Sequence, residues 1–175
     1  PEWENISQQV YVFTDGSCQK IKKGENKGKS LSGYGIFFPQ SDLNERIGAE
    51  HKGRVPGKQT NQRAEMYAIY IALEILLKDE FVRTHKPLIW IGTDSEYCIK
   101  CVTKYIIRWK KNGWKTAKGQ QVEHQDLIQS IDRLLGLLRV KFQFIKAHTT
   151  SQDKWSNGNR KADILAKESI YKFIK

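Results

Sequence analysis

A chain of 175 residues with 39% hydrophobic and 28% charged residues has the length and composition of one folded domain, which excludes a protein that is disordered throughout. No apolar run reaches the roughly 18 residues that a membrane span requires, so we expect a soluble protein without a membrane partner. The net charge of +11 and the isoelectric point near 9.6 favour a polyanionic partner.

The first third of the chain predicts an antiparallel meander. Residues 10–14 (VYVFT) are rich in β-branched and aromatic residues, residues 31–38 (LSGYGIFF) form a second strand, and residues 45–53 (ERIGAEHKG) alternate as a third. Lysine and glycine dominate between the first two strands and predict a flexible basic loop over about 19–31.

Helices and strands then alternate. Residues 60–77 have apolar residues at positions 64, 67, 68, 71, 72 and 75, the spacing of one helical face, and Thr60 or Asn61 can cap this helix. Residues 87–93 (PLIWIGT) form a fourth strand that ends at Asp94, and a helix follows over 95–106. A helix over 125–138, a fifth strand over 140–146 and a last helix from residue 161 complete the chain.

This order predicts an α/β fold with a five-stranded mixed sheet, in which three antiparallel strands are followed by two strands parallel to the first, with helices on both faces. In such sheets the ligand site lies beyond the strand ends where the strand order reverses direction, here between the first and fourth strands. Asp15 and Asp94 occupy those two ends, each after a threonine that closes an apolar strand.

The acidic residues allow two interpretations. Taken alone, Asp15 in Asp-Gly is a turn residue, while Glu65 and Asp163 are acids near the start of a helix. Two carboxylates at adjacent strand ends, however, would repel each other severely unless a cation lay between them. Four acids at one edge of a sheet therefore favour a site for a hard cation such as Mg²⁺.

The positive charge is concentrated between Glu96 and Glu123, where the sequence has no acidic residue. Within this region, residues 104–118 interleave lysines and arginine with tyrosine and tryptophan. Cations for phosphates and flat rings for bases or sugars are typical of a nucleic-acid groove, and a solvated basic face is the alternative.

The cysteines include Cys98-x-x-Cys101, the spacing of a redox or zinc pair, but no second pair of ligands has matching spacing. An odd count inside a helical pattern favours reduced, structural thiols in a reducing compartment.

Seven segments in order, YVFTDGS, GYGIFF, PGKQTNQRAE, TDSEYCI, WKKNGWKT, IKAH and GNRKADILA, resemble the catalytic domain of type 1 ribonuclease H, most closely its eukaryotic cellular form. The resemblance implies the ribonuclease H fold in a single domain over 1–175. It also implies an endonuclease that hydrolyses the RNA strand of RNA/DNA hybrids by two-metal-ion catalysis and leaves 5′-phosphate and 3′-hydroxyl ends. Asp15, Glu65, Asp94 and Asp163 match the family's acidic quartet, which would hold two Mg²⁺ ions, with Mn²⁺ as an alternative.

A loop histidine, His148, is most often an exposed spectator, but the resemblance places it near the scissile phosphate, where it would assist proton transfer or product departure. The sequence departs from the family pattern at two positions in this region. Ala147 stands where the family usually has glycine, and Arg160 where an acid often follows Gly-Asn. These departures concern the conformation and electrostatics of the loop rather than the quartet.

Substrate contacts are implied on both strands. Asn61 and Gln62 have amides suited to the 2′-hydroxyls and base edges of RNA, although each is otherwise a helix cap or an exposed polar residue. The implied DNA-strand and phosphate contacts are Lys58, Thr60, Tyr97, Tyr105, Trp109, Lys110, Lys111, Trp114, Lys115, Thr116 and His124. Tyr105 has a helix-core role as its alternative, and His124 stands where asparagine is more usual.

Two rival functions differ in class. One is another ribonuclease H-like metal nuclease, such as a reverse-transcriptase domain or a transposase-like DNA nuclease; the other is a non-catalytic module that binds hybrids. The basic aromatic segment and the complete quartet favour the hybrid nuclease. We expect an intracellular monomer, in the nucleus or mitochondrion if the organism is eukaryotic. The initial proline leads us to expect a processed chain or an excised piece of a longer protein.

Overall fold

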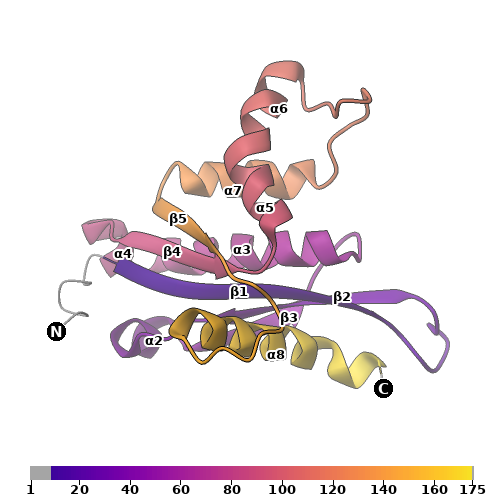
Figure 1. Ribbon diagram of the computed structural model, residues 1–175, viewed down its shortest axis with the longest axis horizontal. Coiled ribbons are helices and arrows are strands. Elements are labelled where there is room, and N and C mark those ends of the chain that lie inside the picture. The colour runs from indigo at the N-terminus through magenta and orange to yellow at the C-terminus, as the bar shows by residue number, and fades with distance from the viewer. Residues whose placement is uncertain (1–8, 175) are drawn as a thin grey trace.

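A five-stranded mixed sheet organises the computed structural model, which describes residues 9–174 (Figure 1). The strand order is β3-β2-β1-β4-β5. β1 pairs antiparallel with β2 and β2 with β3, whereas β1 and β4, and β4 and β5, are parallel. The predicted mixed sheet is therefore confirmed. The strands are β1 (Gln9–Lys20), β2 (Ser30–Phe37), β3 (Glu50–Arg54), β4 (Leu88–Thr93) and β5 (Arg139–Phe144).

Helices cover both faces of this sheet. α8 packs against β1 and β2 on one face, whereas α3 packs against β1 on the other and also contacts α7 (Figure 1). A helical stretch of α5, a π-helical turn η1 and α6 rises away from the sheet. No helix within residues 9–174 has the length and apolar character needed to cross a membrane. The helical elements are α2 (Ser41–Ile47), α3 (Asn61–Lys78), α4 (Glu80–His85), α5 (Glu96–Lys100), η1 (Cys101–Tyr105), α6 (Ile106–Asn112), α7 (Gln125–Leu135) and α8 (Lys154–Ile174).

The α3 helix begins as predicted, because the Thr60 hydroxyl accepts a hydrogen bond from the backbone N–H of Arg63 at 3.2 Å. Its buried stripe differs from the predicted face. Tyr67, Ile71 and Ile75 are only half-buried, since the helix lies between the sheet and α7 and its burial spreads over a wider arc. The buried residues are Ala64, Met66, Ala68, Ile69, Ala72, Leu73 and Leu76.

The predicted third strand over 45–53 was partly wrong. Its first residues belong to α2, which ends at Gly48 with φ of 86°, and only Glu50–Arg54 pair as β3. Arg46 of α2 holds the carboxylate of Asp79 with two hydrogen bonds of 2.8 and 3.1 Å. Asp79 also accepts the N–H of Val82 at 3.1 Å and so caps α4, a helix that the sequence did not predict. A contact between distant residues thus stabilises two short helices.

The start of α8 was also predicted wrongly. The helix begins at Lys154 rather than at residue 161, so Asp163 lies well inside it rather than at its start. Asp153 caps it by accepting the N–H of Ser156 at 2.9 Å. Gly158 then lets the helix approach β1, since a Cβ there would lie 2.3 Å from the Phe13 ring. The polar sequence of these turns gives no apolar periodicity, and long-range packing against β1 decides their conformation.

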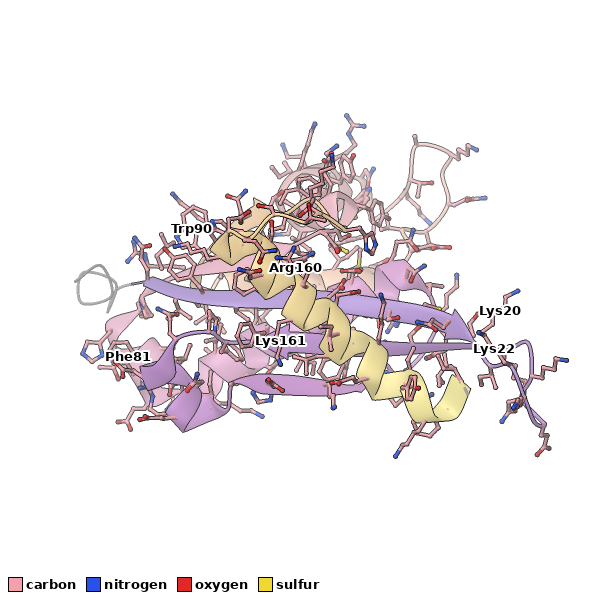
Figure 2. The ribbon with its side chains drawn as sticks, turned by 60° about the horizontal axis from the view of Figure 1, so that its bottom comes forward. Lys20, Lys22, Phe81, Trp90, Arg160 and Lys161 are labelled. Carbon is pink, nitrogen blue, oxygen red and sulfur yellow. The ribbon has the colours of Figure 1, made fainter. Side chains whose placement is uncertain are left out.

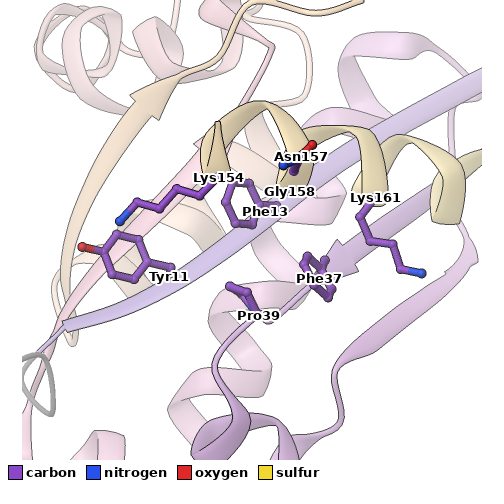
Figure 3. A pocket seen from close by; sticks show the side chains of 8 residues that line it. All are labelled: Tyr11, Phe13, Phe37, Pro39, Lys154, Asn157, Gly158 and Lys161. Atoms are coloured by element: carbon purple, nitrogen blue, oxygen red, sulfur yellow. The ribbon is translucent and has the colours of Figure 1, made fainter. Parts of the chain in front are cut away.

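The first turns of α8 cover an apolar hollow of about 420 Å³ over β1 and β2 (Figure 3). The ammonium group of Lys154 lies 4.6 Å from the centre of the Tyr11 ring at its margin. The hollow is lined by Tyr11, Phe13, Phe37, Pro39, Lys154, Asn157, Gly158 and Lys161. It shares no lining residue with the acidic pocket described below.

The basic residues between the first two strands form a hydrogen-bonded hairpin. Strand β1 continues to Lys20, and the N–H of Ile21 donates to the carbonyl of Lys29 at 2.9 Å. Ile21 packs against the apolar cluster of Leu31, Ile170 and Ile174. β1 therefore continues well beyond the predicted strand end at residue 14, whereas β2 begins close to its predicted start, and Lys20 and Lys22 lie where the strand passes into the hairpin turn (Figure 2).

Candidate active site

Asp15, Glu65 and Asp94 each bring one carboxylate oxygen to within 4.8 Å of the others. The register between β1 and β4 pairs Phe13 with Gly92, two residues before each aspartate, so parallel pairing sets the two acids side by side. β1 does not end at Asp15, as the sequence suggested; it continues with β2 as its partner where pairing to β4 has stopped. Asp15 thus lies within a continuous strand, just after the point where its pairing with β4 ends.

Glu65 reaches the same point from the second turn of α3. One of its carboxylate oxygens, Oε2, is buried without a hydrogen-bond partner in the described part of the chain. A buried carboxylate oxygen without a donor is costly unless a cation or a proton compensates it. The interpretation of Glu65 as a solvated acid near a helix start therefore does not fit its surroundings.

The electrostatics of the cluster also call for a compensating cation or proton. The pKa of Asp15 is raised to about 8, chiefly by burial, with contributions from the charges of Asp94 and Asp163. Burial also raises the pKa of Glu65, to which the charge of Asp15 adds, and burial is the main cause of the raised pKa of Asp94. The carboxylates cannot all be charged without compensation. Their oxygen donors and mutual spacing fit a hard divalent cation such as Mg²⁺.

The fourth predicted acid, Asp163, lies beside this group. It lines a pocket of about 220 Å³ together with Asp94 and His148, and it is close enough to Asp15 to raise the pKa of that residue. One of its oxygens also pairs with Lys167 Nζ at 3.0 Å, one helical turn further along α8. The structure thus gathers the quartet at one site, with carboxylate oxygens of three acids within 4.8 Å of one another and Asp163 at the margin.

His148 lines the same pocket from the loop between β5 and α8. Its side chain is exposed, and its positive charge, when protonated, would favour the ionised form of Asp94. The backbone of His148 has φ of 56°, in the left-handed region. The histidine is therefore within the candidate site and accessible to substrate.

The predicted RNA-strand contacts, Asn61 and Gln62, are exposed in the first turn of α3, one turn before Glu65. Thr60 provides the helix cap, so the side chain of Asn61 is not needed for that purpose. Both amides are available to a ligand that approaches the acidic cluster.

The predicted phosphate contacts Lys58 and His124 lie on either side of Glu123. Lys58 Nζ is 3.3 Å from Glu123 Oε1, and His124 Nε2 is 3.8 Å from Glu123 Oε2. His124 is buried before α7, with φ of 61°, and burial lowers its pKa. The hydroxyl of Thr60 already accepts one hydrogen bond, from the N–H of Arg63, as the cap of α3. Glu123, whose charge lies between the two proposed ligands, was not among the predicted site residues.

The aromatic residues of the basic segment form a ladder. The ring centres of Tyr105 and Trp109 are 5.8 Å apart, and those of Trp109 and Trp114 are 6.1 Å apart. All three rings are half-buried. Each packs against the main core and is also partly accessible to solvent. Tyr97, on α5, is the most exposed of the predicted aromatic contacts, with 44% of its surface accessible.

The lysines of this segment are not equivalent. Lys110 Nζ pairs with Asp132 of α7 at 2.6 Å, whereas Lys111 and Lys115 have no carboxylate partner within residues 9–174. The backbone of Lys115 is held by the side chain of Asn112, and the hydroxyl of Thr116 accepts the N–H of Gln120 at 3.2 Å. Two lysines are therefore available for phosphates, and Thr116 is mainly a turn residue.

Asn159 also belongs to the site, although the sequence analysis did not select it. Its Nδ2 donates to Asp94 Oδ2 at 3.4 Å, and its Oδ1 is buried without a partner in the described chain. This bond lowers the pKa of Asp94, against the larger effect of burial. Nothing local marks this asparagine, because its role depends on α8 starting early enough to carry it to β4.

The sequence is related to those of known proteins. The RNase H family model matches residues 7–171. The chain is 35% identical over 161 residues to the Ribonuclease H of Schizosaccharomyces pombe, covering 92% of this chain and 53% of that protein. It is 30% identical over 164 residues to the Ribonuclease H of Thiobacillus denitrificans, covering 92% and 93%. It is 32% identical to Ribonuclease H1 of Homo sapiens, covering 91% and 49%.

The chain thus spans about half the length of the fission-yeast and human relatives. Bacterial and eukaryotic relatives match with similar identity, so the predicted proximity to the eukaryotic form stays a prediction.

Solved structures agree on the fold. The solution structure of the PFV RNase H domain has a TM-score of 0.72 and 26% identity, with 93% of this chain and 94% of that chain covered. A foamy viral protease-reverse transcriptase, solved in complex with RNA/DNA hybrid, has a TM-score of 0.73 at 23% identity and covers 95% of this chain and 20% of that chain, a likeness of fold alone. The family model matches nearly the whole chain, and the bacterial relative is matched over 93% of its length. These two matches show that this chain belongs to the RNase H family.

Proposed function

We propose that this chain hydrolyses the RNA strand of RNA/DNA hybrids as an endonuclease, leaving 5′-phosphate and 3′-hydroxyl ends. Asp15, Glu65, Asp94 and Asp163 would hold two Mg²⁺ ions, with Mn²⁺ as an alternative. The observation that chiefly supports this proposal is the set of three carboxylate oxygens within 4.8 Å of one another, beside a buried Glu65 oxygen without a partner. Family membership supports the same activity.

The ions, when bound, would lower the pKa of the attacking water and stabilise charge on the leaving oxygen. The role of the protein is to fix four oxygen donors on rigid elements, two from the central strands and two from the helices that cover them. Asn159 orients the Asp94 carboxylate through its amide. His148 would move a proton at the leaving oxygen or help the product to depart, which is consistent with its exposure beside Asp94 and Asp163.

Selectivity for the hybrid would come from two separate surfaces. The exposed amides of Asn61 and Gln62 can recognise 2′-hydroxyls on the strand nearest the acids, which would direct cleavage to RNA. Lys111, Lys115 and the exposed Tyr97 would hold the DNA strand, with phosphate contacts from Lys58 and His124. We further propose that the protein acts as an intracellular monomer and that it is closest to the eukaryotic cellular enzymes, in the nucleus or mitochondrion.

The decisive experiment is digestion of an RNA/DNA hybrid labelled separately on each strand, with Mg²⁺, Mn²⁺ or EDTA. We expect cleavage of the RNA strand only, dependence on the metal ion, and product ends that a ligase requiring 5′-phosphate accepts. Duplex DNA and double-stranded RNA of the same sequence are the controls. Preferred cleavage of duplex DNA would instead identify a transposase-like nuclease, and tight hybrid binding without cleavage would identify a non-catalytic module.

A further inference from the structure

The loop that carries His148 joins β5 to α8 and has an uncommon backbone conformation. His148 has a positive φ of 56°, in the left-handed region, which is uncommon for residues other than glycine although histidine enters it more often than most. The residue before it is Ala147, which adds no backbone freedom. The last sheet-like hydrogen bond before the loop joins the N–H of Ile145 to the carbonyl of Thr93 at 2.9 Å. Contacts after residue 148 can therefore help to maintain this conformation.

Arg160 provides such contacts from α8. Its Nη1 donates to the carbonyl of Thr149 at 2.9 Å, and its Nη2 donates to the carbonyl of Ser151 and to Asn157 Oδ1. A guanidinium group holds two carbonyls in fixed relative positions because it is planar and always charged, and charge-assisted hydrogen bonds are stronger than neutral ones. The residue immediately after His148 is thus fastened to the helix that carries Asp163.

The far end of the loop has an anchor in which Arg160 takes no direct part. The Asp153 carboxylate accepts hydrogen bonds from the N–H of Ser156 at 2.9 Å and from the Ser156 hydroxyl at 3.0 Å, which stabilises the start of α8. The Asn157 amide donates to the carbonyl of Gln152 at 2.8 Å. These contacts hold residues 152 and 153, but they do not reach Thr149. Loss of the Arg160 contacts would therefore release the part of the loop nearest His148 while α8 stays capped.

We propose that Arg160 is a positioning residue that holds the His148 loop against α8, so that the imidazole faces Asp94 and Asp163. All four residues line the same pocket of about 220 Å³. The inference rests on the proposed role of His148 in hybrid cleavage. Displacement of a catalytic group by about 1 Å can cost up to roughly 10²-fold in rate, so a tether of this kind can matter without contacting substrate.

Lys161 provides a matched control. It is the next residue on α8 and has the same formal charge, but its Nζ pairs with Glu50 of β3 at 2.8 Å, away from the His148 loop (Figure 2). Arg160→Gln and Lys161→Gln therefore change the net charge equally, and only the first removes the bonds to the loop. Arg160→Lys keeps the charge but cannot bridge both carbonyls with the same geometry.

The test is a double-mutant cycle in single-turnover cleavage of hybrid by saturating protein with Mg²⁺. We expect His148→Ala to slow cleavage of the bound hybrid by roughly 10²-fold and Arg160→Gln by about 10-fold, with little change in the protein concentration that gives half-saturation. Adding Arg160→Gln to His148→Ala should cause no further loss, because the tether then positions nothing. Arg160→Lys should be intermediate, and Lys161→Gln should match the parent protein.

A second measurement reports on the loop itself. Hydrogen exchange of the amides of residues 148–151 should be faster in Arg160→Gln and unchanged in Lys161→Gln, with α8 protected in both. A parent-like rate for Arg160→Gln would overturn the proposal. So would an equal loss in the presence and absence of His148, because Arg160 would then act on the substrate directly.

The same cycle separates this proposal from the function on which it rests. If the parent protein does not cleave the hybrid, the proposed function fails. If His148→Ala cleaves at the parent rate, the role of His148 fails and the positioning role of Arg160 fails with it. If His148→Ala is slow and Arg160→Gln is not, only the positioning role is wrong.

Discussion

Gly16 of β1 lies directly against the backbone of Glu65 in α3: a Cβ at position 16 would be 2.4 Å from the Glu65 nitrogen. The N–H of Gly16 also donates to Asp15 Oδ1 at 2.9 Å. The glycine thus allows α3 to approach β1 closely enough for the acids of the two elements to meet. The spacing of Asp15 and Glu65 depends on the absence of a side chain between them.

Gly16→Ala should therefore force α3 away from β1. We expect destabilisation of about 1–3 kcal/mol, as for other overpacked sites, together with a large loss of cleavage. Urea unfolding and the hybrid assay would measure the two effects. Gly136→Ala is the control, since Gly136 has φ of −74° and its new Cβ would be no closer than 3.4 Å to other atoms. A Gly16→Ala protein as stable and active as the control would contradict the inferred contact.

The raised pKa values predict a pH-dependent stability for the metal-free protein. Burial raises the pKa of Asp15 from 3.8 to about 8, so the folded state holds this proton more tightly than the unfolded state. Stability should then fall as pH rises from about 4 to about 8. Thermal unfolding in EDTA would show the decline, and Asp15→Asn should reduce it. Added Mg²⁺ should raise Tm more at pH 8 than at pH 5; an equal rise at both values would count against these acids as the ligands.

Asp94→Asn should separate chemistry from folding. The substitution removes one charge from a repelling cluster and deletes no buried apolar surface, so we expect an unchanged or higher Tm in EDTA. Cleavage should fall by orders of magnitude, because a neutral amide is a poor ligand for Mg²⁺, while hybrid binding remains. Near-normal turnover at saturating Mg²⁺ would remove Asp94 from the proposed site.

Glu123→Gln should tighten hybrid binding. Its carboxylate is 3.3 Å from Lys58 Nζ, with 67% of the side-chain surface exposed, and it opposes any phosphate at Lys58. Because an exposed ion pair is worth up to about 1 kcal/mol, we expect up to roughly fivefold higher affinity at low salt. Glu74→Gln, which changes a carboxylate paired with Arg133, should leave affinity unchanged. Weaker binding of Glu123→Gln would show that Lys58 and His124 do not face a phosphate.

The lysines of the basic segment should differ in how much they contribute to hybrid binding. Changing Lys111 and Lys115 together to alanine should weaken hybrid binding and lower the slope of log K against log salt by about two, one for each lost phosphate contact. Lys110→Ala should have a smaller effect, because Lys110 is paired with Asp132. Fluorescence anisotropy over a salt series would measure both. An unchanged slope in the double variant would mean that the segment is a solvated basic face.

Much of the site was predictable from the sequence because its signals are local. Asp15 and Asp94 each follow a threonine at the end of an apolar stretch, and parallel pairing of their strands brings them together without further information. The periodicity of α3 likewise predicted the helix that presents Glu65. Such patterns arise from the regular spacing of apolar residues along one strand or helix, and this spacing can be read from a single continuous segment of the sequence.

Only the tertiary structure decided which groups are paired and which are free. The early start of α8 depends on Gly158 packing against Phe13, and it carries Asn159 to Asp94 and Arg160 to the His148 loop. The pairing of Lys110 with Asp132, and the position of Glu123 beside Lys58, join residues from different elements. Charge counts and spacing cannot supply these relationships, because they depend on how elements distant in the sequence pack against one another.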